Sequence, residues 1–274
     1  RELDGPHADG SGRAGERGAE VRYDAGMHDR PTVAAMAVVA SGTATFLHEG
    51  VGHGLVAWLL GCQPTELTSN HLSANVPNDW VSAGGTLVNL AVGAAALALS
   101  VRSGARDNRR YFLWLLGALN LLPGAGYFLF SGVGGVGDWA AIAERNGLPW
   151  GWRVGLGLFG AALYYGVTLL LARTLHPFVP ERRAYNAVAR WPYLVAGVFS
   201  VVSGLLDPMG LPLLLISTIP AAFGGSSGLL WADNLLPRTA PAVALEVRRQ
   251  RGWWFAAAVL GGAYVLVLGP GVKL

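Results

Sequence analysis

The feature that most constrains this chain is a series of long apolar runs that carry almost no charged side chains. A helix needs roughly 20 mostly apolar residues to cross the hydrocarbon core of a bilayer. Seven runs approach or exceed that length, at residues 32–60, 80–101, 111–130, 152–171, 191–206, 211–230 and 253–268. Charged residues make up 14% of the chain, against about 25% in soluble domains. We therefore predict an all-α polytopic membrane protein with about six to seven transmembrane helices.

The arginines between these runs predict how the helices are oriented. Basic residues occur in every second loop, at positions 102, 106, 109 and 110, at 173, 182, 183 and 190, and at 238, 248, 249 and 251. Cytoplasmic loops of membrane proteins carry such an excess of Lys and Arg. We therefore expect an integral, multi-pass protein in the lipid bilayer with a cytoplasmic N-terminus. A net charge of +3, dispersed over these loops, gives no reason to expect nucleic acid as a partner.

The first 30 residues differ in composition from the rest. Residues 1–30 are rich in Gly, Asp, Glu and Arg and nearly lack large aliphatic side chains, so they cannot bury enough surface to become ordered. We expect them to be a disordered or non-native N-terminal segment. The remaining chain divides into residues 31–140, which carry the chemical motifs described next, and residues 141–274, which add further transmembrane helices.

The first apolar run contains His48, Glu49 and His53. Ionisable groups inside a membrane helix are costly, and by default they indicate a functional site. Imidazoles bind Zn²⁺, and an adjacent carboxylate can deprotonate a water molecule. The usual zinc motif is H-E-x-x-H, with both histidines on one helix face. Here the second histidine follows at i+5, about 140° away in an ideal helix.

A one-residue π-bulge would bring the two histidines back to a common face. Gly50 and Gly52 lie between them and free the backbone for that distortion. The H-E-x-x-G-H spacing resembles the metal motif of the soluble dipeptidyl peptidase III family. The alternative interpretation is a polar contact between helices, with the histidines hydrogen-bonded across the bundle.

Three later segments complete a larger pattern. The second run contains a glycine-rich stretch that ends at Asn89, the third contains Asn120-Leu121-Leu122-Pro123, and a further glycine-rich run ends at Asp138. With the histidines, these segments resemble the site-2 protease family of intramembrane zinc metalloproteases, over about a third of the chain. Three departures from the family pattern are the longer histidine spacing, Gly84-Gly85 in place of Gly-Pro, and the late Asp138, which precedes Trp139.

The resemblance implies a role for each matching residue. Asp138 would be the third metal ligand, Asn89 and Asn120 would contact substrate or an oxyanion, and residues 61–79 would form an extended, membrane-associated sheet. A continuous helix would place Asn120 and Asp138 about 27 Å apart, so the chain must turn back. We expect a break near Pro123, followed by a re-entrant piece over residues 131–137. His71 is a rival third ligand, with Glu66 behind it.

These observations predict a zinc-dependent intramembrane metallopeptidase. Zn²⁺ would be held by His48, His53 and Asp138, Glu49 would be the catalytic base, and a transmembrane or membrane-proximal peptide would be the substrate. Two alternatives stay open. One is a non-proteolytic membrane transport or binding protein with a buried His/Glu metal site, and the other is an inactive protease homologue.

Overall fold

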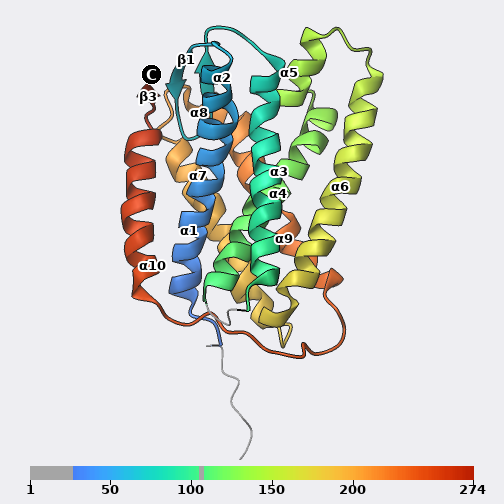
Figure 1. Ribbon diagram of the computed structural model, residues 1–274, viewed down its shortest axis with the longest axis vertical. Coiled ribbons are helices and arrows are strands. Elements are labelled where there is room, and N and C mark those ends of the chain that lie inside the picture. Colours follow the sequence, from blue (N-terminus) through green and yellow to red (C-terminus); the bar gives the residue numbers. More distant parts are fainter. Residues whose placement is uncertain (1–26, 105–107) are drawn as a thin grey trace, which may run out of the picture.

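The computed structural model describes residues 27–104 and 108–274, and it contains a bundle of membrane-length helices (Figure 1). Seven helical segments in the described residues are long and apolar enough to cross a membrane. They are Arg30–Leu59, Asp79–Arg102, Asn108–Gly134, Gly151–Phe178, Asn186–Gly204, Gly210–Leu235 and Arg251–Leu268. The predicted spans therefore all correspond to helices, in the predicted order.

Several spans change helix type along their length. The first consists of α1 (Arg30–Phe46), the π-helical η1 (Leu47–Leu55) and α2 (Val56–Leu59), whereas the second and third are the single helices α3 (Asp79–Arg102) and α4 (Asn108–Gly134). The fourth and fifth comprise α6 (Gly151–Leu175), η2 (His176–Phe178), η3 (Asn186–Arg190) and α7 (Trp191–Gly204). The sixth comprises α8 (Gly210–Leu213), η4 (Leu214–Thr218), η5 (Pro220–Gly225), α9 (Gly228–Trp231) and η6 (Ala232–Leu235). The seventh comprises α10 (Arg251–Ala256), η7 (Ala257–Gly261) and η8 (Tyr264–Leu268).

Helix α4 lies at the centre of the bundle and packs against both α3 and α6. Its first turns bury two large aromatic side chains, Tyr111 and Trp114. Both find polar partners: the Tyr111 hydroxyl donates to the carbonyl of Val188 at 2.8 Å, and Trp114 Nε1 donates to the carbonyl of Leu171 at 3.3 Å. Buried polar groups that are satisfied in this way rigidify a core. These bonds tie the start of α4 to η3 and α6.

The outside of the bundle is apolar. Leu158, Phe255 and Leu266 are at least 70% exposed, and many other large apolar side chains are exposed with them. Exposed apolar surface on this scale marks contact with a membrane or another protein. The last span is the most peripheral, since only 6% of its apolar window is buried, and it packs mainly on α1.

A small sheet covers one end of the bundle. The hairpin strands β1 (Pro64–Leu67) and β2 (Leu72–Ala74) pair with each other, and β3 (Val272–Lys273) adds to the other side of β1. All pairings are antiparallel. The expected extended segment within residues 61–79 is thus confirmed, whereas its pairing with the C-terminal strand was not foreseen. The sheet makes the fold predominantly, rather than purely, helical.

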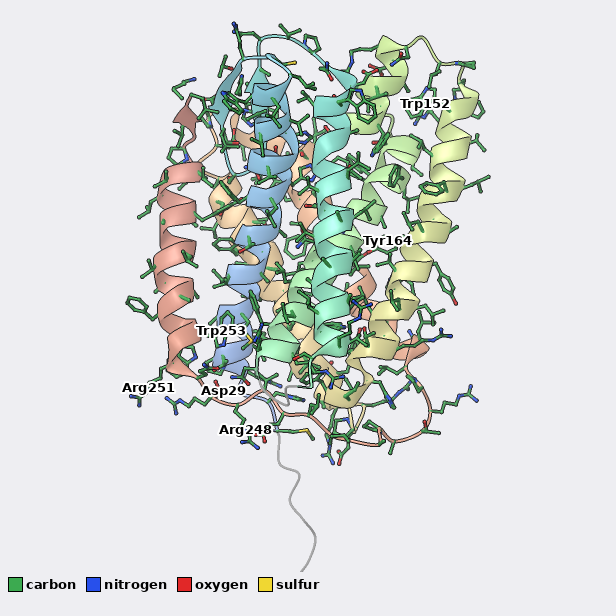
Figure 2. The ribbon with its side chains drawn as sticks, in the orientation of Figure 1. Asp29, Trp152, Tyr164, Arg248, Arg251 and Trp253 are labelled. Atoms are coloured by element: carbon green, nitrogen blue, oxygen red, sulfur yellow. The ribbon has the colours of Figure 1, made fainter. Side chains whose placement is uncertain are left out.

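The opposite end of the bundle carries the basic loops, and Figure 2 shows Asp29, Arg248 and Arg251 at this end. Most of the segment expected to be disordered, residues 1–30, lies outside the described residues. Its last four residues are described, and His28 among them is buried. His28 Nε2 lies 2.9 Å from the carbonyl of Phe178, and its Nδ1 accepts the N–H of Val247 at 3.1 Å. This part of the segment therefore belongs to the packed structure.

The predicted break near Pro123 is wrong. Helix α4 continues through Pro123 to Gly134, so no re-entrant piece spans residues 131–137. A proline inside a helix removes one backbone hydrogen bond, here the one to the carbonyl of Leu119. Leu119 and Pro123 both line a cavity whose lining mixes apolar and polar side chains. Transmembrane helices tolerate proline where neighbouring polar groups satisfy the freed carbonyl.

Candidate metal centre

The two histidines of the first span are brought together by a change of helix type. Residues Leu47–Leu55 form a π-helix, inserted between α-helical segments of the same span. The rings of His48 and His53 meet edge to face with their centroids 4.7 Å apart. The expectation that a π-bulge restores their common face is therefore confirmed.

Glycines allow α3 to approach this distorted segment closely. A Cβ atom added to Gly84 would collide with the carbonyl oxygen of Gly52, and one added to Gly52 would collide with Gly85. A Cβ atom on Gly85 would lie only 2.6 Å from Nε2 of both His48 and His53. The absence of a side chain at Gly85 thus leaves open the space that the two imidazole nitrogens face.

Asp138 enters the same space from the other side. The chain reverses after α4 at Gly135 and Gly137, whose φ angles of +67° and +87° suit glycine. Asp138 then begins the short helix α5 (Asp138–Arg145). Its Oδ2 lies 3.7 Å from Nε2 of His48 and 3.5 Å from Nε2 of His53. The chain does turn back as expected, but at the glycines beyond α4.

Helix α5 is fastened to α3 at both ends. At its start, Trp139 Nε1 donates to Oγ1 of Thr86 at 3.2 Å, and the Trp139 ring stacks on Phe128 with a centroid distance of 4.7 Å. At its end, Arg145 pairs with Asp79 at 2.8 Å. These contacts hold Asp138 in position against the histidines.

The other nitrogen of each imidazole has its own partner. Nδ1 of His53 lies 2.6 Å from the carbonyl of Val81, so Nδ1 carries a proton, and in the neutral ring Nε2 is left with a free lone pair. Nδ1 of His48 lies 3.2 Å from Nδ2 of the Asn89 side-chain amide. A neutral His48 with a free Nε2 lone pair carries its proton on Nδ1, and it would donate that proton to Asn89 once the amide is turned so that its oxygen faces the ring. Metal-binding histidines are commonly oriented in this way by a second hydrogen bond.

The geometry of the three ligand atoms fits a metal ion. One ligand atom from each of His48, His53 and Asp138 lies within 4.8 Å of the other two. Two ligands that are each about 2.0–2.1 Å from a tetrahedral Zn²⁺ lie roughly 3.3–3.4 Å apart, close to the two nitrogen–oxygen distances observed. His48 Nε2 and Asp138 Oδ2 are buried without a hydrogen-bond partner among the described residues, and such atoms call for an explanation.

The ionisation of Asp138 also bears on whether this cluster can hold a metal ion. Burial by itself would raise the pKa of Asp138, but His48 and His53 outweigh burial and lower that pKa when their Nε2 atoms carry a proton and donate to the carboxylate. A bound metal ion would take the place of those protons. The carboxylate is thus in the deprotonated form that a metal requires.

Glu49 lies beside the cluster and is not part of it. Its side chain is buried and lines a cavity together with His48, Asn89 and Tyr127. A carboxylate that is next to a metal site, and not consumed as a ligand, is free to accept a proton. The arrangement therefore separates three potential ligands from one potential base.

Tyr127 is a site residue that the sequence did not indicate. Its ring lies over His48 with a centroid distance of 5.1 Å, and a Cβ atom added to Gly137, just before Asp138, would lie 3.5 Å from its Cε1. A tyrosine one turn beyond a proline in an apolar run carries no signal of its own. Only the tertiary structure places Tyr127 between His48 and the α5 turn.

Asn120 is not brought to this site. It is fully buried in α4, its amide donates to the carbonyl of Leu116 at 2.8 Å, and it is not among the residues that line the cavity. The observed contacts thus include Asn89 but give Asn120 no approach to the cluster.

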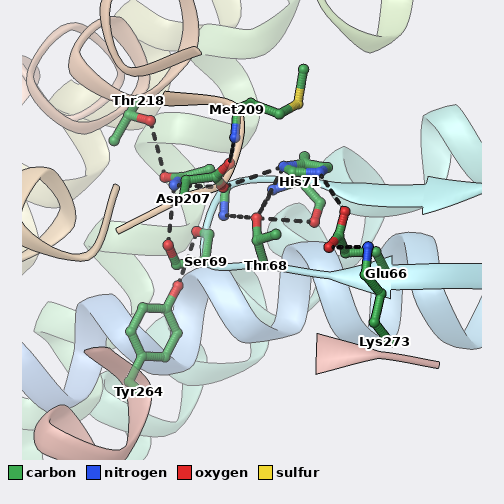
Figure 3. A network of polar contacts seen from close by, with 10 residues as sticks. Glu66, Thr68, Ser69, His71, Asp207, Met209, Thr218, Tyr264 and Lys273 are labelled. Atoms are coloured by element: carbon green, nitrogen blue, oxygen red, sulfur yellow. Dashed lines mark hydrogen bonds and ion pairs between the residues drawn. The ribbon is translucent and has the colours of Figure 1, made fainter. Parts of the chain in front are cut away.

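His71 and Glu66, the rival ligands, belong to a different polar network, which Figure 3 shows beside the sheet. His71 Nδ1 lies 3.3 Å from Oδ2 of Asp207, and its Nε2 lies 3.9 Å from Oε2 of Glu66. Glu66 also pairs with Lys273 of β3 at 2.8 Å. His71 therefore helps to fasten the hairpin to its surroundings, while Asp138 takes the third place in the cluster.

Comparison with known proteins adds no relative to this picture. No family model matches the chain, and neither the curated proteins nor the solved structures contain a significant match to it.

Proposed function

We propose that this protein is an integral-membrane zinc hydrolase that cleaves a membrane-embedded or membrane-proximal peptide. The observation that carries the proposal is the convergence of His48, His53 and Asp138, from two distant segments, on one buried space. A π-helix, a close glycine contact and a glycine turn are all needed to build it. Packing alone gives no reason for so specific an arrangement of buried ionisable groups.

The residues of the chain have distinct parts in this proposal. A Zn²⁺ ion bound by the three ligands would supply Lewis acidity and a lowered pKa of water. Glu49 would take a proton from the attacking water and pass it to the leaving amine. Asn89 would hold His48 in the ligand orientation. The peptide must be locally unwound, because the carbonyls of an intact helix are already hydrogen-bonded.

The types of the three ligands support zinc as the metal. Two imidazoles and one carboxylate form a ligand set known from catalytic zinc sites, which keep the fourth position open. The motifs resemble those of site-2 proteases, and we propose a divergent relative of that family. We also propose a cytoplasmic N-terminus, from the basic loops at one end of the bundle.

The first experiment is metal analysis of the detergent-purified protein. We expect zinc near one equivalent per chain in the wild type and its loss in His53→Ala and in Asp138→Ala. The matched control is His71→Ala, which lies outside the cluster and should keep its zinc. A wild type that stays metal-free after zinc supplementation would refute the hydrolase proposal.

Glu49→Gln separates hydrolysis from the alternatives. If Glu49 is the base, the variant keeps its zinc and loses cleavage of membrane peptides. If the protein transports or stores metal, Glu49→Gln changes metal uptake into vesicles instead. An inactive homologue binds zinc in the wild type and cleaves no peptide in either form.

A further inference from the structure

The cavity beside Glu49 extends well beyond the candidate metal centre. It has a volume of about 100 Å³, much larger than the roughly 10–15 Å³ that a single water needs. From His48 and Glu49 it continues along α1 to Ser41, and it is bounded on the other side by α7, η4 and η5. Its lining is rich in hydroxyl groups, which come from Ser41, Thr45, Ser69, Ser200, Ser203, Ser217, Thr218, Ser226, Tyr127 and Tyr264.

Six of these ten hydroxyl groups donate their protons to acceptors within the protein, among them Tyr264, which donates to the carbonyl of Ser69 at 3.1 Å. Thr45, Ser200 and Ser203 donate to carbonyls one turn earlier in their own helices, at 3.1, 3.0 and 2.9 Å, and Ser226 does the same. Thr218 donates to the side-chain oxygen of Asn70 at 3.0 Å. A hydroxyl has one proton and two lone pairs. The oxygens therefore turn mainly acceptor capacity toward the cavity.

The lining gives this cavity a definite chemical preference. Glu49 adds a carboxylate, a further acceptor, and none of the described residues that line the cavity is Lys or Arg. A group that brings hydrogen-bond donors is therefore favoured over one that brings acceptors. In a membrane, the donors most in need of partners are the backbone N–H groups of an unwound segment, because each unsatisfied group costs several kcal/mol there.

We propose that this hydroxyl-lined cavity is the binding cleft for an unwound peptide segment, whose backbone N–H groups bond to the serine and threonine oxygens. The inference rests on the proposed function and names the form in which that substrate is held. The cleft adjoins Glu49 and His48 directly, so a segment lying in it reaches the candidate catalytic groups. It would favour peptides that unwind easily and have small side chains.

Disulfide cross-linking tests this cleft without a known natural substrate. Ser217 lines the cavity, whereas Leu215 on the same helix is 62% exposed on the outside. Ser217→Cys and Leu215→Cys are made in a Cys62→Ala background, which removes the native thiol. The probes are two leucine-based transmembrane peptides with one central cysteine, flanked by glycines in one peptide and by leucines in the other. All are reconstituted in phosphatidylcholine vesicles.

Ser217→Cys should form adducts with the glycine peptide up to about tenfold more than with the leucine peptide, the ratio that one net hydrogen bond can produce. Leu215→Cys should not discriminate. Replacing Ser200 and Ser203 with alanine should bring the ratio at Ser217→Cys towards one. Ser200→Cys serves as a second reporter if Ser217→Cys does not fold.

Two outcomes would overturn the proposal. Equal adducts with both peptides at the cavity reporters would mean that the cavity holds water only, and discrimination at Leu215→Cys as well would mean that peptide flexibility alone sets the yield. Zinc content is measured on the same samples. A metal-free wild type that still discriminates would refute the hydrolase while leaving the cleft, and a zinc-loaded protein that does not discriminate would refute the cleft alone.

Discussion

Replacing Gly85 with alanine should abolish metal binding while leaving the protein folded. The added Cβ atom would lie 2.6 Å from Nε2 of both His48 and His53. Ordinary contacts begin near 3.4 Å, so each nitrogen would have to retreat by about 0.8 Å, the difference between these two distances. Ligand distances in metal sites tolerate only about 0.2 Å. The variant cannot keep both imidazoles in place.

The expected loss of zinc affinity is at least about 100-fold, because changes one shell further out already cost about 10- to 100-fold. Helix propensity cannot be the cause, since alanine is better than glycine in a helix by up to about 1 kcal/mol. The assay is zinc competition against a chromophoric chelator, with a thermal unfolding curve recorded in the same detergent.

Gly93→Ala is the matched control. Gly93 lies on the same helix, and its added Cβ atom would meet Leu121 Cγ at 2.7 Å, away from the cluster. Both variants should lose stability by about 1–3 kcal/mol through overpacking, but Gly93→Ala should keep its zinc. Wild-type zinc affinity in Gly85→Ala, or an equal loss in both variants, would refute the geometry of the site.

Three other perturbations test separate parts of the structure. Tyr127→Phe should retain zinc and lower kcat of peptide cleavage by about 10- to 100-fold if its hydroxyl stabilises the transition state; unchanged kcat would rule out that role. Trp139→Phe removes the hydrogen bond to Thr86, and we expect zinc affinity to fall about tenfold, as measured by the same chelator competition. Burial lowers the pKa of His28 below 6.5, so the unfolded chain binds the proton more readily, and this contribution to stability is present above pH 6.5 and lost on acidification. His28→Phe also removes the acceptor for the Val247 N–H, so the variant should unfold at a lower temperature than the wild type at pH 8. Its unfolding temperature should also change less between pH 7 and pH 5, and an unaltered pH dependence would contradict a role for His28 protonation.

The membrane architecture was predictable because it depends on local composition. Each span is a run of apolar residues bounded by breakers, and the requirement for internal backbone hydrogen bonding leaves the chain little choice but a helix. The same local logic predicted the π-helix, because His53 follows His48 at i+5 and two glycines between them permit the distortion. The ionisable residues His48, Glu49 and His53 in such a run then predicted the position of the site.

Features that depend on distant contacts were not predictable from the sequence. The sequence predicted a helix break near Pro123 and a re-entrant piece over residues 131–137, but α4 tolerates the proline and the chain turns only at Gly135 and Gly137. Tyr127 reaches His48 only through the packing of α4 against the first span. Strand β3 adds to β1 from about 200 residues further along the chain, as counted from the pairing of Glu66 with Lys273. No local pattern encodes such contacts.

The π-helix also relates two motifs that differ in length by one residue. Without Gly52, the same run would read His-Glu-Gly-Val-His, the H-E-x-x-H spacing of an undistorted α-helix. Inserting one codon into an α-helix turns everything beyond it by about 100°, whereas a π-bulge absorbs the extra residue within one turn. The side of α2 that faces its neighbours therefore stays the same despite the extra residue. Searches that require a fixed histidine spacing would consequently separate sequences that differ by a single inserted codon and share one ligand geometry.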